Sequence, residues 1–573
     1  MLNAERVLDD TYPNINFGKN KKLIIKILKK LIHEDDLNKV IERNQHLRGF
    51  AFLDKLLDYF NFSYQVGNYS LNNIPSERRL IIVANHPIGT LDGLTLLKLV
   101  RTVRPDVRIV ANRVLNHVEP LQSLFFPVAV LSDKKDLKDT YQHLIQALEN
   151  EEAIIFFPAG EVSRITPKGV LDGDWQTGFL KLALRTQSPV LPIHIKAKNS
   201  ALFYSLSTLY KPLGTMLLVN EMFNKRNQEI KFSVGAPIPY SAIVASKESN
   251  KKLAQKFRKQ VINLGKKSKK SLFPTVETVI HPSDTRAIKK ALYASTLLGE
   301  TRDNKKIFLY DFKDDCPVMR EIARLRELTF RTVEEGTGLA LDLDKFDIYY
   351  RHIVLWDDHD LEIVGSYRIG EGANILKEQG IDGFYTQTLF ELNGHFSEYL
   401  SDSIELGRSF VQPRYWGQNS LDYLWYGIGA YLRERPEIRY MFGPVSLSSS
   451  YPQAAKELIV GFYQQQFGQD LPPVQARMPF HISEQTEAFA KAEFCFDYVT
   501  NFKTLKSELQ QLGVKVPTLY KQYVELCVDN GCHFMGFNVD PDFNYCIDSL
   551  VMIEVDKITP KKKQRYINKS LTN

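Results

Sequence analysis

One histidine and one aspartate share a polar segment that follows an apolar run. The run 79–84 (RLIIVA) is followed by NHPIGTLDG, residues 85–93. A histidine can act as a general base near neutral pH, and a nearby carboxylate can hold its tautomer and stabilise its protonated form. His86 and Asp92 are therefore candidates for removing a proton from a hydroxyl group. The alternative is a capped loop in which His86 has only a structural role, because Asp92 also lies at a predicted helix start.

Two further polar segments follow apolar runs. Residues 153–157 (AIIFF) lead into PAGEVSR, residues 158–164, and the run 107–111 leads into Asn112-Arg113. A Pro-x-Gly turn with polar side chains after a buried strand can present backbone N–H groups and a cation to an anion.

The elements that must position these segments follow an α/β pattern. Strands are predicted at 79–84, 107–111, 153–157, 189–195 and 230–234, with helices between them at 92–103, 135–148 and 175–186. This alternation predicts a largely parallel sheet. Ligands usually bind at the loops that follow the carboxyl ends of such strands.

Together, the three segments resemble the phospholipid/glycerol acyltransferases of the lysophosphatidate acyltransferase type, over roughly residues 75–245. The resemblance implies that His86 and Asp92 form the catalytic pair and that Arg113 belongs to the second family block. Gly160, Glu161, Ser163 and Arg164 fall on its Phe-Pro-x-Gly block, and residues 189–195 are similar to its final block.

The reaction that this resemblance implies is O-acylation. His86 would take the proton from an acceptor hydroxyl, and that oxygen would attack an acyl thioester while backbone donors and cations stabilise the oxyanion. Arg113 or Arg164 would pair with an anionic head group, and an arginine fork fits a carboxylate as well as a phosphate.

The sequence departs from the family pattern at two places. Five residues separate His86 from Asp92 where the family has four, and Phe-Pro-Glu-Gly is replaced by Phe-Pro-Ala-Gly, with Glu161 one position later. The His-Pro-x-Gly-x-Leu-Asp-Gly form is similar to the haemolysin-like subgroup linked to aminolipid synthesis. These departures affect the expected substrate more than the expected reaction.

The second half contains ELGRSFVQPRYWGQN, residues 405–419, before a predicted helix at 420–433. This strand, turn and helix resemble the core of acyl-CoA N-acyltransferases (GNAT), in which the turn and the helix N-terminus bind the donor's phosphate. The resemblance assigns donor binding to Val411, Arg414, Gly417 and Asn419. Asn419 replaces the usual glycine or alanine.

A closer similarity is to the autoinducer-synthase and ornithine-lipid N-acyltransferase branch, over roughly residues 305–555. The residues that carry it are Arg326, Phe330, Asp344, Asp347, Arg368, Glu405 and Arg408, in the order that the branch uses. It implies that Glu405 helps to deprotonate an amine, which attacks the thioester directly, and that the other six bind substrate. The donor of that branch is acyl carrier protein.

Two questions about these residues stay open at this point. In a regular strand, Glu405 and Arg408 point to opposite faces, so both line one site only if a bulge intervenes, or else their roles are separate. Arg326, Asp344 and Asp347 could equally be a surface set of salt bridges.

Composition restricts the function classes. The 573 residues carry 74 Lys and Arg against 67 Asp and Glu, a net charge of +7 that does not by itself predict a nucleic-acid partner. The five cysteines are odd in number and form no Cys-x-x-Cys pair, so neither a disulfide framework nor a metal site is expected. With no transmembrane run or signal peptide, we expect a cytoplasmic protein, peripheral on the inner membrane.

Two basic segments could provide the membrane contact. Residues 19–34 (KNKKLIIKILKKLIHE) have apolar residues on one helix face and lysines around it. Residues 247–270 carry ten Lys or Arg and one acid, with Leu253, Phe257, Val261 and Leu264 at helical spacing. Each fits an anionic membrane surface or, alternatively, a helix packed on its own domain.

The predicted architecture is an α/β N-terminal acyltransferase domain followed by an α+β GNAT-like domain. We expect a helical segment at 1–75, the acyltransferase-like domain at 76–265, a linker at 266–303, the GNAT-like domain at 304–559 and a disordered basic tail at 560–573.

The chain resembles bifunctional ornithine-lipid (aminolipid) synthases along most of its length. The C-terminal domain would N-acylate an amino acid with a 3-hydroxyacyl group, and the N-terminal domain would O-acylate the hydroxyl of that lyso-lipid. The implied donor is acyl carrier protein or acyl-CoA, with no bound cofactor and no metal. A glycerolipid O-acyltransferase with an accessory GNAT-like domain, or a non-catalytic haemolysin-like membrane-binding protein, are the alternatives. The amino acid, chain lengths, oligomeric state and any transfer of the intermediate between the sites stay open.

Overall fold

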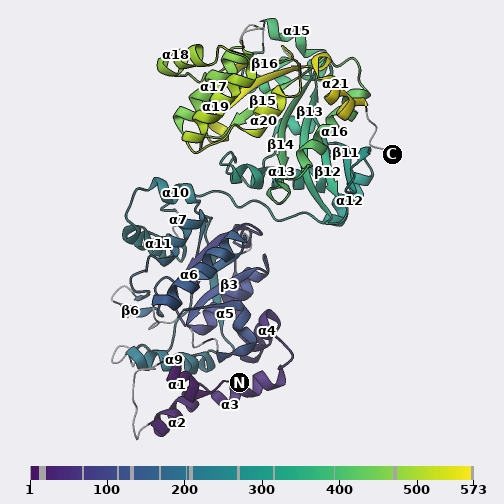
Figure 1. The fold of residues 1–573 in the computed structure, drawn as a ribbon. Coiled ribbons are helices and arrows are strands. Elements are labelled where there is room, and N and C mark those ends of the chain that lie inside the picture. Colours follow the sequence, from purple (N-terminus) through teal and green to yellow (C-terminus); the bar gives the residue numbers. More distant parts are fainter. Residues whose placement is uncertain are drawn as a thin grey trace. The chain divides into compact units, whose positions relative to one another are not determined.

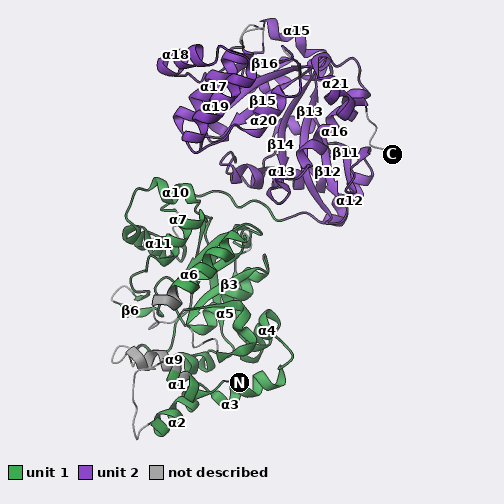
Figure 2. Ribbon diagram, viewed as in Figure 1, with its two compact units in different colours: residues 1–281 green, residues 282–573 purple. Residues whose placement is uncertain are grey.

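The protein divides into two compact units in the computed structural model. Unit 1 spans Met1–His281 and unit 2 spans Pro282–Asn573 (Figure 2). The structure describes residues 2–11, 21–67, 70–112, 115, 117–128, 134–166, 169–201, 203–205, 211–266, 271–313, 316–392, 394–468, 471, 474–528 and 530–568. Each unit has its own sheet and hydrophobic core.

Unit 1 contains a mixed sheet of seven described strands, in the order β1-β9-β8-β2-β5-β3-β4. The strands are β1 (Ser63–Val66), β2 (Leu80–Ala84), β3 (Val107–Asn112), β4 (Phe125–Val128), β5 (Ala153–Phe156), β8 (Val190–Lys196) and β9 (Glu229–Val234). All paired neighbours run parallel except β8 and β9. The predicted α/β domain with a largely parallel sheet is therefore confirmed.

Helices cover both faces of this sheet (Figure 1). Alternate residues of the fully buried β2 enter the two cores, as expected for a central parallel strand. The helices are α1 (Ala4–Thr11), α2 (Lys21–Leu31), α3 (Glu34–Arg43), α4 (Gly49–Phe60), α5 (Thr90–Arg101), α6 (Lys134–Glu149), α7 (Gly178–Thr186), α9 (Lys211–Asn224), α10 (Tyr240–Ala245) and α11 (Asn250–Leu264). A small hairpin of β6 (Arg164–Thr166) and β7 (Gly169–Leu171) lies apart from the main sheet.

The two basic helices differ in what their apolar residues contact. In α11, Leu253, Phe257 and Val261 are buried in the core of unit 1, which supports the interpretation as a helix packed on its own domain. In α2, Leu28 is buried against α1, but Leu23 and Ile27 are 59% and 51% exposed. Only α2 of this pair therefore keeps large apolar side chains facing solvent.

Unit 2 has a sheet of eight described strands, in the order β10-β11-β12-β13-β14-β15-β17-β16. The strands are β10 (Thr296–Glu300), β11 (Lys305–Asp311), β12 (Arg351–Asp357), β13 (Glu362–Glu371), β14 (Ser403–Val411), β15 (Tyr440–Leu447), β16 (Cys532–Asp540) and β17 (Cys546–Glu554). Only β14 and β15 pair in parallel among these strands, and their ladder ends at Glu405 and Phe442. The α+β prediction is confirmed.

The helices of unit 2 also lie on both faces of its sheet. They are α12 (Thr285–Tyr293), α13 (Pro317–Thr332), α14 (Gly372–Gln379), α15 (Ser397–Leu400), α16 (Ser420–Arg433), α17 (Gln453–Phe467), α18 (Glu484–Glu493), α19 (Tyr498–Gln511), α20 (Thr518–Val524) and α21 (Pro560–Lys562). α16 begins and ends at the residues that the sequence pattern predicts.

A β-bulge in β14 answers the question about Glu405 and Arg408. The register between β13 and β14 shifts between the pairs Arg368–Gly407 and Ser366–Phe410. Arg408 lies at this shift with a φ of 49°, in the left-handed region. The extra residue turns the Arg408 side chain out of the regular alternation, so it reaches the side of the sheet where Glu405 lies.

The structure corrects two predicted boundaries and one grouping. The expected linker 266–303 contains α12 and β10, because Ile288 and Leu292 are buried in the core of unit 2. The expected disordered tail is helical as far as residue 568, because Tyr566 packs against α16 and donates to Asp422. The predicted separate segment 1–75 supplies β1 to the sheet of unit 1.

None of the helices in the described ranges combines the length and the apolar character needed to cross a bilayer.

Candidate active sites

His86 and Asp92 meet at the carboxyl end of β2. The Nδ1 atom of His86 lies 2.9 Å from Oδ1 of Asp92, and neither atom has another hydrogen-bond partner among the described residues. Asp92 is fully buried in the first turn of α5, where its Oδ2 accepts from the amides of Ile88 and Gly89. Asp92 therefore fixes both the loop and one edge of the imidazole, which leaves Nε2 to accept a proton.

Gly89 makes room for the longer spacing between these two residues. Its φ of 96° is a conformation that other residues rarely adopt, and a Cβ at this position would lie 3.0 Å from Leu218. The loop can therefore accommodate five intervening residues and still place His86 against Asp92.

The surroundings of His86 favour its protonation. Burial disfavours the charged ring, but the charge and hydrogen bond of Asp92, together with the charge of Asp172, outweigh it and raise the pKa of His86 above its ordinary value. The ring stacks on Phe157, with 4.0 Å between centroids, and 20% of the side chain remains exposed. His86 is thus held on one face and one edge and remains reachable elsewhere.

The predicted Phe-Pro-x-Gly block lies beside this loop. The amide of Ser163 donates to the His86 carbonyl over 2.7 Å, and Gly160 has a φ of 69°. Arg164 and Glu161 form an ion pair at 3.3 Å. Arg113, the remaining predicted residue of this site, lies outside the described residues.

Sequence reasoning missed Asp172 in this region. Its buried carboxylate accepts from the amide of His86 over 3.2 Å and from the Ser163 hydroxyl. No sequence pattern marked it, because it follows a short hairpin and belongs to no predicted strand or helix.

In unit 2, the predicted charged residues form one buried cluster rather than a surface set. Arg326 and Asp347 pair at 2.8 Å and are both fully buried, and Arg368 lies 2.6 Å from Asp344 and 3.3 Å from Asp347. Burial opposes ionisation of Asp347, but the charges of Arg326 and Arg368 outweigh it and hold the pKa of this carboxyl below its ordinary value.

Arg408 extends this cluster toward Tyr385. Its guanidinium lies 3.4 Å from Asp342 and 3.7 Å from Asp344, and it donates to the Tyr385 hydroxyl over 3.2 Å. Phe543 lies under the same guanidinium and packs on the predicted Phe330. Six of the seven predicted residues therefore meet here, and sequence reasoning missed Asp342.

Glu405 is held by the segment that Arg408 contacts. Its two oxygens accept from the Thr386 amide over 2.6 Å, the Tyr385 amide over 3.2 Å, and the hydroxyls of Thr386 and Tyr350. Burial raises the pKa of Glu405 above its ordinary value, although the bonds from Thr386 and Tyr350 act in the opposite direction. To take a proton from an amine, this carboxylate would have to release one of these donors.

The predicted donor loop follows β14. Val411 accepts from the indole of Trp416, Gly417 has a φ of 76°, and Asn419 immediately precedes α16. Arg414 pairs with Asp360, from the turn between β12 and β13, and with Glu362, the first residue of β13. The backbone turn and the helix N-terminus therefore lie together, while the Arg414 side chain is engaged by carboxylates.

The comparisons with known proteins follow the division into two units. Residues 6–270 match the family model of an acyltransferase, and residues 325–426 match that of an acetyltransferase (GNAT) domain. A glycine N(alpha)-acyltransferase of Bacteroides thetaiotaomicron is 31% identical over 306 residues, covering 51% of this chain and 90% of that protein. The chain belongs to the same family of acyltransferases as this relative.

Two further relatives are similar to this acyltransferase. A lyso-glycine lipid O-acyltransferase of Bacteroides thetaiotaomicron is 28% identical over 254 residues, covering 43% of this chain and 92% of that protein. An L-ornithine N(alpha)-acyltransferase of Brucella abortus is 32% identical over 149 residues, covering 23% of this chain and 51% of that protein. The predicted pairing of an acyltransferase domain with a GNAT domain is confirmed.

Within the ranges that the structure describes, no group of three or more His, Cys, Asp or Glu side chains is arranged to hold a metal ion.

Proposed function

We propose that the acyltransferase makes an aminolipid in two steps. Unit 2 transfers a 3-hydroxyacyl group to the α-amino group of an amino acid, and unit 1 then acylates the 3-hydroxyl group of that lyso-lipid. The observation that carries the proposal is the joining of two acyl-transfer domains in one chain, with relatives named for N-acylation of an amino acid and for O-acylation of a lyso-lipid.

The geometry at His86 supports the second step. A neutral imidazole with Nδ1 held by Asp92 presents Nε2 to the hydroxyl of the lyso-lipid, and the new alkoxide attacks the thioester carbon. The thiolate of the donor leaves and takes up the proton from His86. Arg164 begins β6, directly after the neighbouring loop, and its guanidinium fits the carboxylate of an acylated amino acid.

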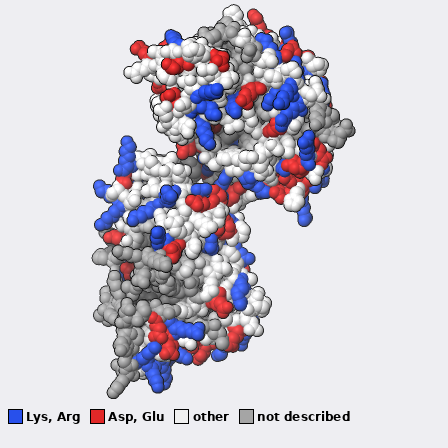
Figure 3. All heavy atoms as spheres, viewed as in Figure 1, with Lys and Arg blue, Asp and Glu red and all other residues white. Residues whose placement is uncertain are grey.

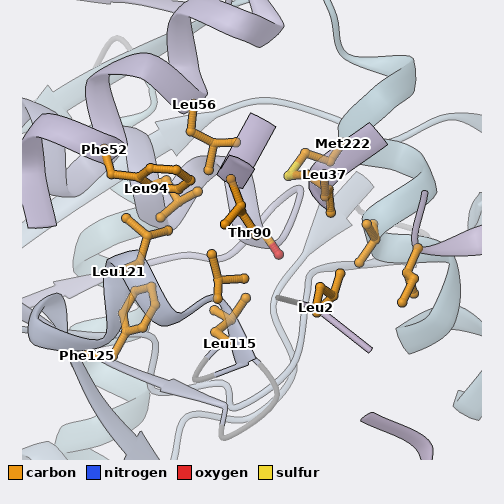
Figure 4. A pocket seen from close by; sticks show the side chains of 14 residues that line it. Leu2, Leu37, Phe52, Leu56, Thr90, Leu94, Leu115, Leu121, Phe125 and Met222 are labelled. Atoms are coloured by element: carbon orange, nitrogen blue, oxygen red, sulfur yellow. The ribbon is translucent and has the colours of Figure 1, made fainter. Parts of the chain in front are cut away.

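An apolar cavity beside this loop supports a lipid substrate. Its lining is almost entirely aliphatic and aromatic, and Figure 4 shows Thr90, from the first turn of α5, in the middle of the lining side chains. The lining residues are Leu2, Ile32, Leu37, Ile41, Phe52, Leu56, Thr90, Leu94, Leu115, Val118, Leu121, Phe125, Val219 and Met222. A fatty chain placed here would have its reacting end near the His86 loop, because Thr90 lies two residues before Asp92.

In unit 2, the buried arginines support recognition of a small zwitterion. Arg368 and Arg408 offer positive charge for the carboxylate of an amino acid, and Asp342 and Asp344 offer negative charge for its ammonium group. We assign Glu405 to assist deprotonation of that amine. The donor's phosphate fits the turn before α16, and acyl carrier protein or acyl-CoA would supply it.

The helix α2 supports contact with an anionic membrane. Lys22, Lys26 and Lys30 are exposed beside the exposed Leu23 and Ile27, and Figure 3 shows Lys and Arg side chains gathered over this end of unit 1. Lysines around exposed apolar residues fit a surface of acidic head groups and acyl chains. We propose that α2 holds unit 1 at the membrane, where the two-chain product must be released.

Expression in a bacterium that makes no aminolipids tests this function. The expected result is a new lipid that contains no phosphate and carries two acyl chains by mass spectrometry. It should stain with ninhydrin only if the acylated amino acid retains a free amine. The fragment masses of this lipid identify the amino acid and distinguish glycine from ornithine.

Two other outcomes would overturn the proposal. Rescue of a lysophosphatidate acyltransferase defect without a new aminolipid would identify a glycerolipid O-acyltransferase. Membrane leakage without any new lipid would identify a non-catalytic membrane-binding protein.

A further inference from the structure

The carboxylate of Asp172 is bonded to both loops of the O-acylation site. Asp172 is 4% exposed. Its Oδ1 accepts from the backbone amide of His86 over 3.2 Å and from the hydroxyl of Ser163, and its Oδ2 accepts from Trp175 Nε1 over 3.0 Å. All three partners are donors, which is the arrangement that an ionised carboxylate satisfies.

Asp172 completes a small hydrogen-bond network between the two loops. The amide of Ser163 donates to the carbonyl of His86, while the hydroxyl of Ser163 and the amide of His86 both donate to Asp172. Both backbone polar groups of His86 are therefore used to hold it against the Ser163 loop. An alternative path for the His86 backbone would leave a buried charge with fewer donors, which is costly.

The segment that carries Asp172 is itself anchored from α11. Arg258 donates to the Asp172 carbonyl, and Gln255 donates to the Trp175 carbonyl over 3.3 Å. Phe257 and Val261 of α11 are buried in the core of unit 1, so this anchor is joined to the packed core. The position of His86 thus depends on a helix that is remote from it in the sequence.

We propose that Asp172 is a positioning residue for His86, a role that rests on the proposed O-acylation at this site. Asp92 orients the imidazole through Nδ1, whereas Asp172 fixes the backbone from which the imidazole projects and adds a second negative charge within reach of it. A base must be placed to within a fraction of an ångström of the hydroxyl that it deprotonates, so a loosened loop costs rate rather than substrate binding.

The variant Asp172→Asn tests this role in the full-length protein. O-acylation of a synthetic N-(3-hydroxyacyl) amino acid is followed by mass spectrometry across a range of pH. We expect kcat to fall by about tenfold to a hundredfold with little change in KM, because the loop is loosened while the acceptor site remains.

The pH profile provides the readout that a merely structural role would not change. His86 accepts a proton only when it is neutral, so activity falls as the pH drops through its pKa. Loss of the Asp172 charge destabilises the imidazolium, so the acidic limb of kcat/KM is expected to move to lower pH in Asp172→Asn. Ser163→Ala keeps the negative charge of Asp172 but removes the hydrogen bond from the Ser163 hydroxyl. It should therefore lower kcat without moving the acidic limb of kcat/KM.

Glu221→Gln is the matched control. Glu221 is another buried carboxylate of unit 1, and within the described ranges it accepts from the Ser200 amide and hydroxyl and from the Asn224 amide group rather than from His86. Its replacement should reduce thermal stability without moving the acidic limb. N-acylation by unit 2 reports in every variant that the chain is intact.

Three results separate the possibilities. Wild-type kcat and an unmoved limb in Asp172→Asn would overturn the positioning role. If Asp172→Asn does not fold, wild-type kcat in Ser163→Ala would overturn it instead. If the unaltered protein makes no two-chain lipid from the synthetic acceptor, the proposed O-acylation itself is wrong.

Discussion

The two candidate centres differ in how completely their reactive groups are bonded. His86 has one edge against Asp92 and one face on Phe157, and a fifth of its side chain remains exposed. Glu405 is 1% exposed and accepts from four donors of its own unit. A base must exchange a proton with its substrate, so the structure of unit 1 is closer to a working arrangement, whereas Glu405 must first give up a donor.

The difference also shows what holds each centre. In unit 1, Asp92 accepts hydrogen bonds at the start of a helix and orients the imidazole, and Asp172 holds the backbone of His86. In unit 2 a network of arginines and aspartates holds the neighbouring segment, and Glu405 ties Tyr385 and Thr386 to the sheet. Changes at His86 should therefore affect chemistry alone, whereas changes at Glu405 should affect both chemistry and structure.

The largest expected effect is that of His86→Ala. Loss of a general base costs about 10²-fold to 10⁴-fold in rate, so the cells should accumulate the single-chain N-acyl product and little or no two-chain lipid. Mass spectrometry of the extracted lipids measures both species. A two-chain lipid at wild-type level would show that the His86–Asp92 pair has no part in O-acylation.

Glu405→Ala is expected to give neither product, because the second step depends on the first. The substitution removes the acceptor for four donors, and each buried donor left unpaired costs about 1–3 kcal/mol, so the stability of unit 2 should also fall. The same lipid extracts and a thermal unfolding curve measure both effects.

A supplied N-(3-hydroxyacyl) amino acid separates the two centres in this variant. It should be converted to the two-chain lipid by Glu405→Ala, since unit 1 is unaltered. Tyr350→Phe, which removes one of the four donors, should lower N-acylation by only a few-fold. Continued N-acylation by Glu405→Ala would show that Glu405 is not the base in unit 2.

The smallest expected effect is that of replacing the exposed lysines of α2, which tests the membrane contact proposed for unit 1. Replacing Lys22, Lys26 and Lys30 of α2 with glutamine should weaken binding to anionic vesicles by about fivefold per lysine, since each contributes about 1 kcal/mol near an acidic surface. O-acylation on vesicles should fall with binding, and N-acylation should not. Vesicle sedimentation at low and high salt measures the binding.

Replacing Lys251, Lys252 and Lys259 of α11 with glutamine is the control. These lysines are also exposed, but the apolar face of that helix is buried. Equal loss from both helices would indicate a general effect of net charge rather than a contact made by α2.

Much of the fold could be predicted from local patterns. Apolar runs gave the central strands of unit 1 and the strand–helix pair β14 and α16, because these elements bury several consecutive or regularly spaced side chains. The end of the linker and the course of the tail could not be predicted in this way. Each depends on one or two apolar residues, such as Ile288 and Tyr566, that pack on distant elements.

The candidate site residues divide along the same line. His86 and Asp92 were accessible to sequence reasoning because they lie close together in one short segment, where a motif includes both. Asp172 and Asp342 were not, because His86 and Arg408, which they contact in the two sites, are far away in the sequence and a single aspartate carries no pattern.

The sequence by itself determined the two domain types and the reactive residue types, since apolar periodicity and short motifs are local properties of the chain. The tertiary structure alone decided that Arg408 reaches the side of Glu405, through a bulge whose left-handed residue no propensity predicts. It also decided which basic helix keeps its apolar side chains exposed, because burial depends on what the rest of the fold places against a helix face.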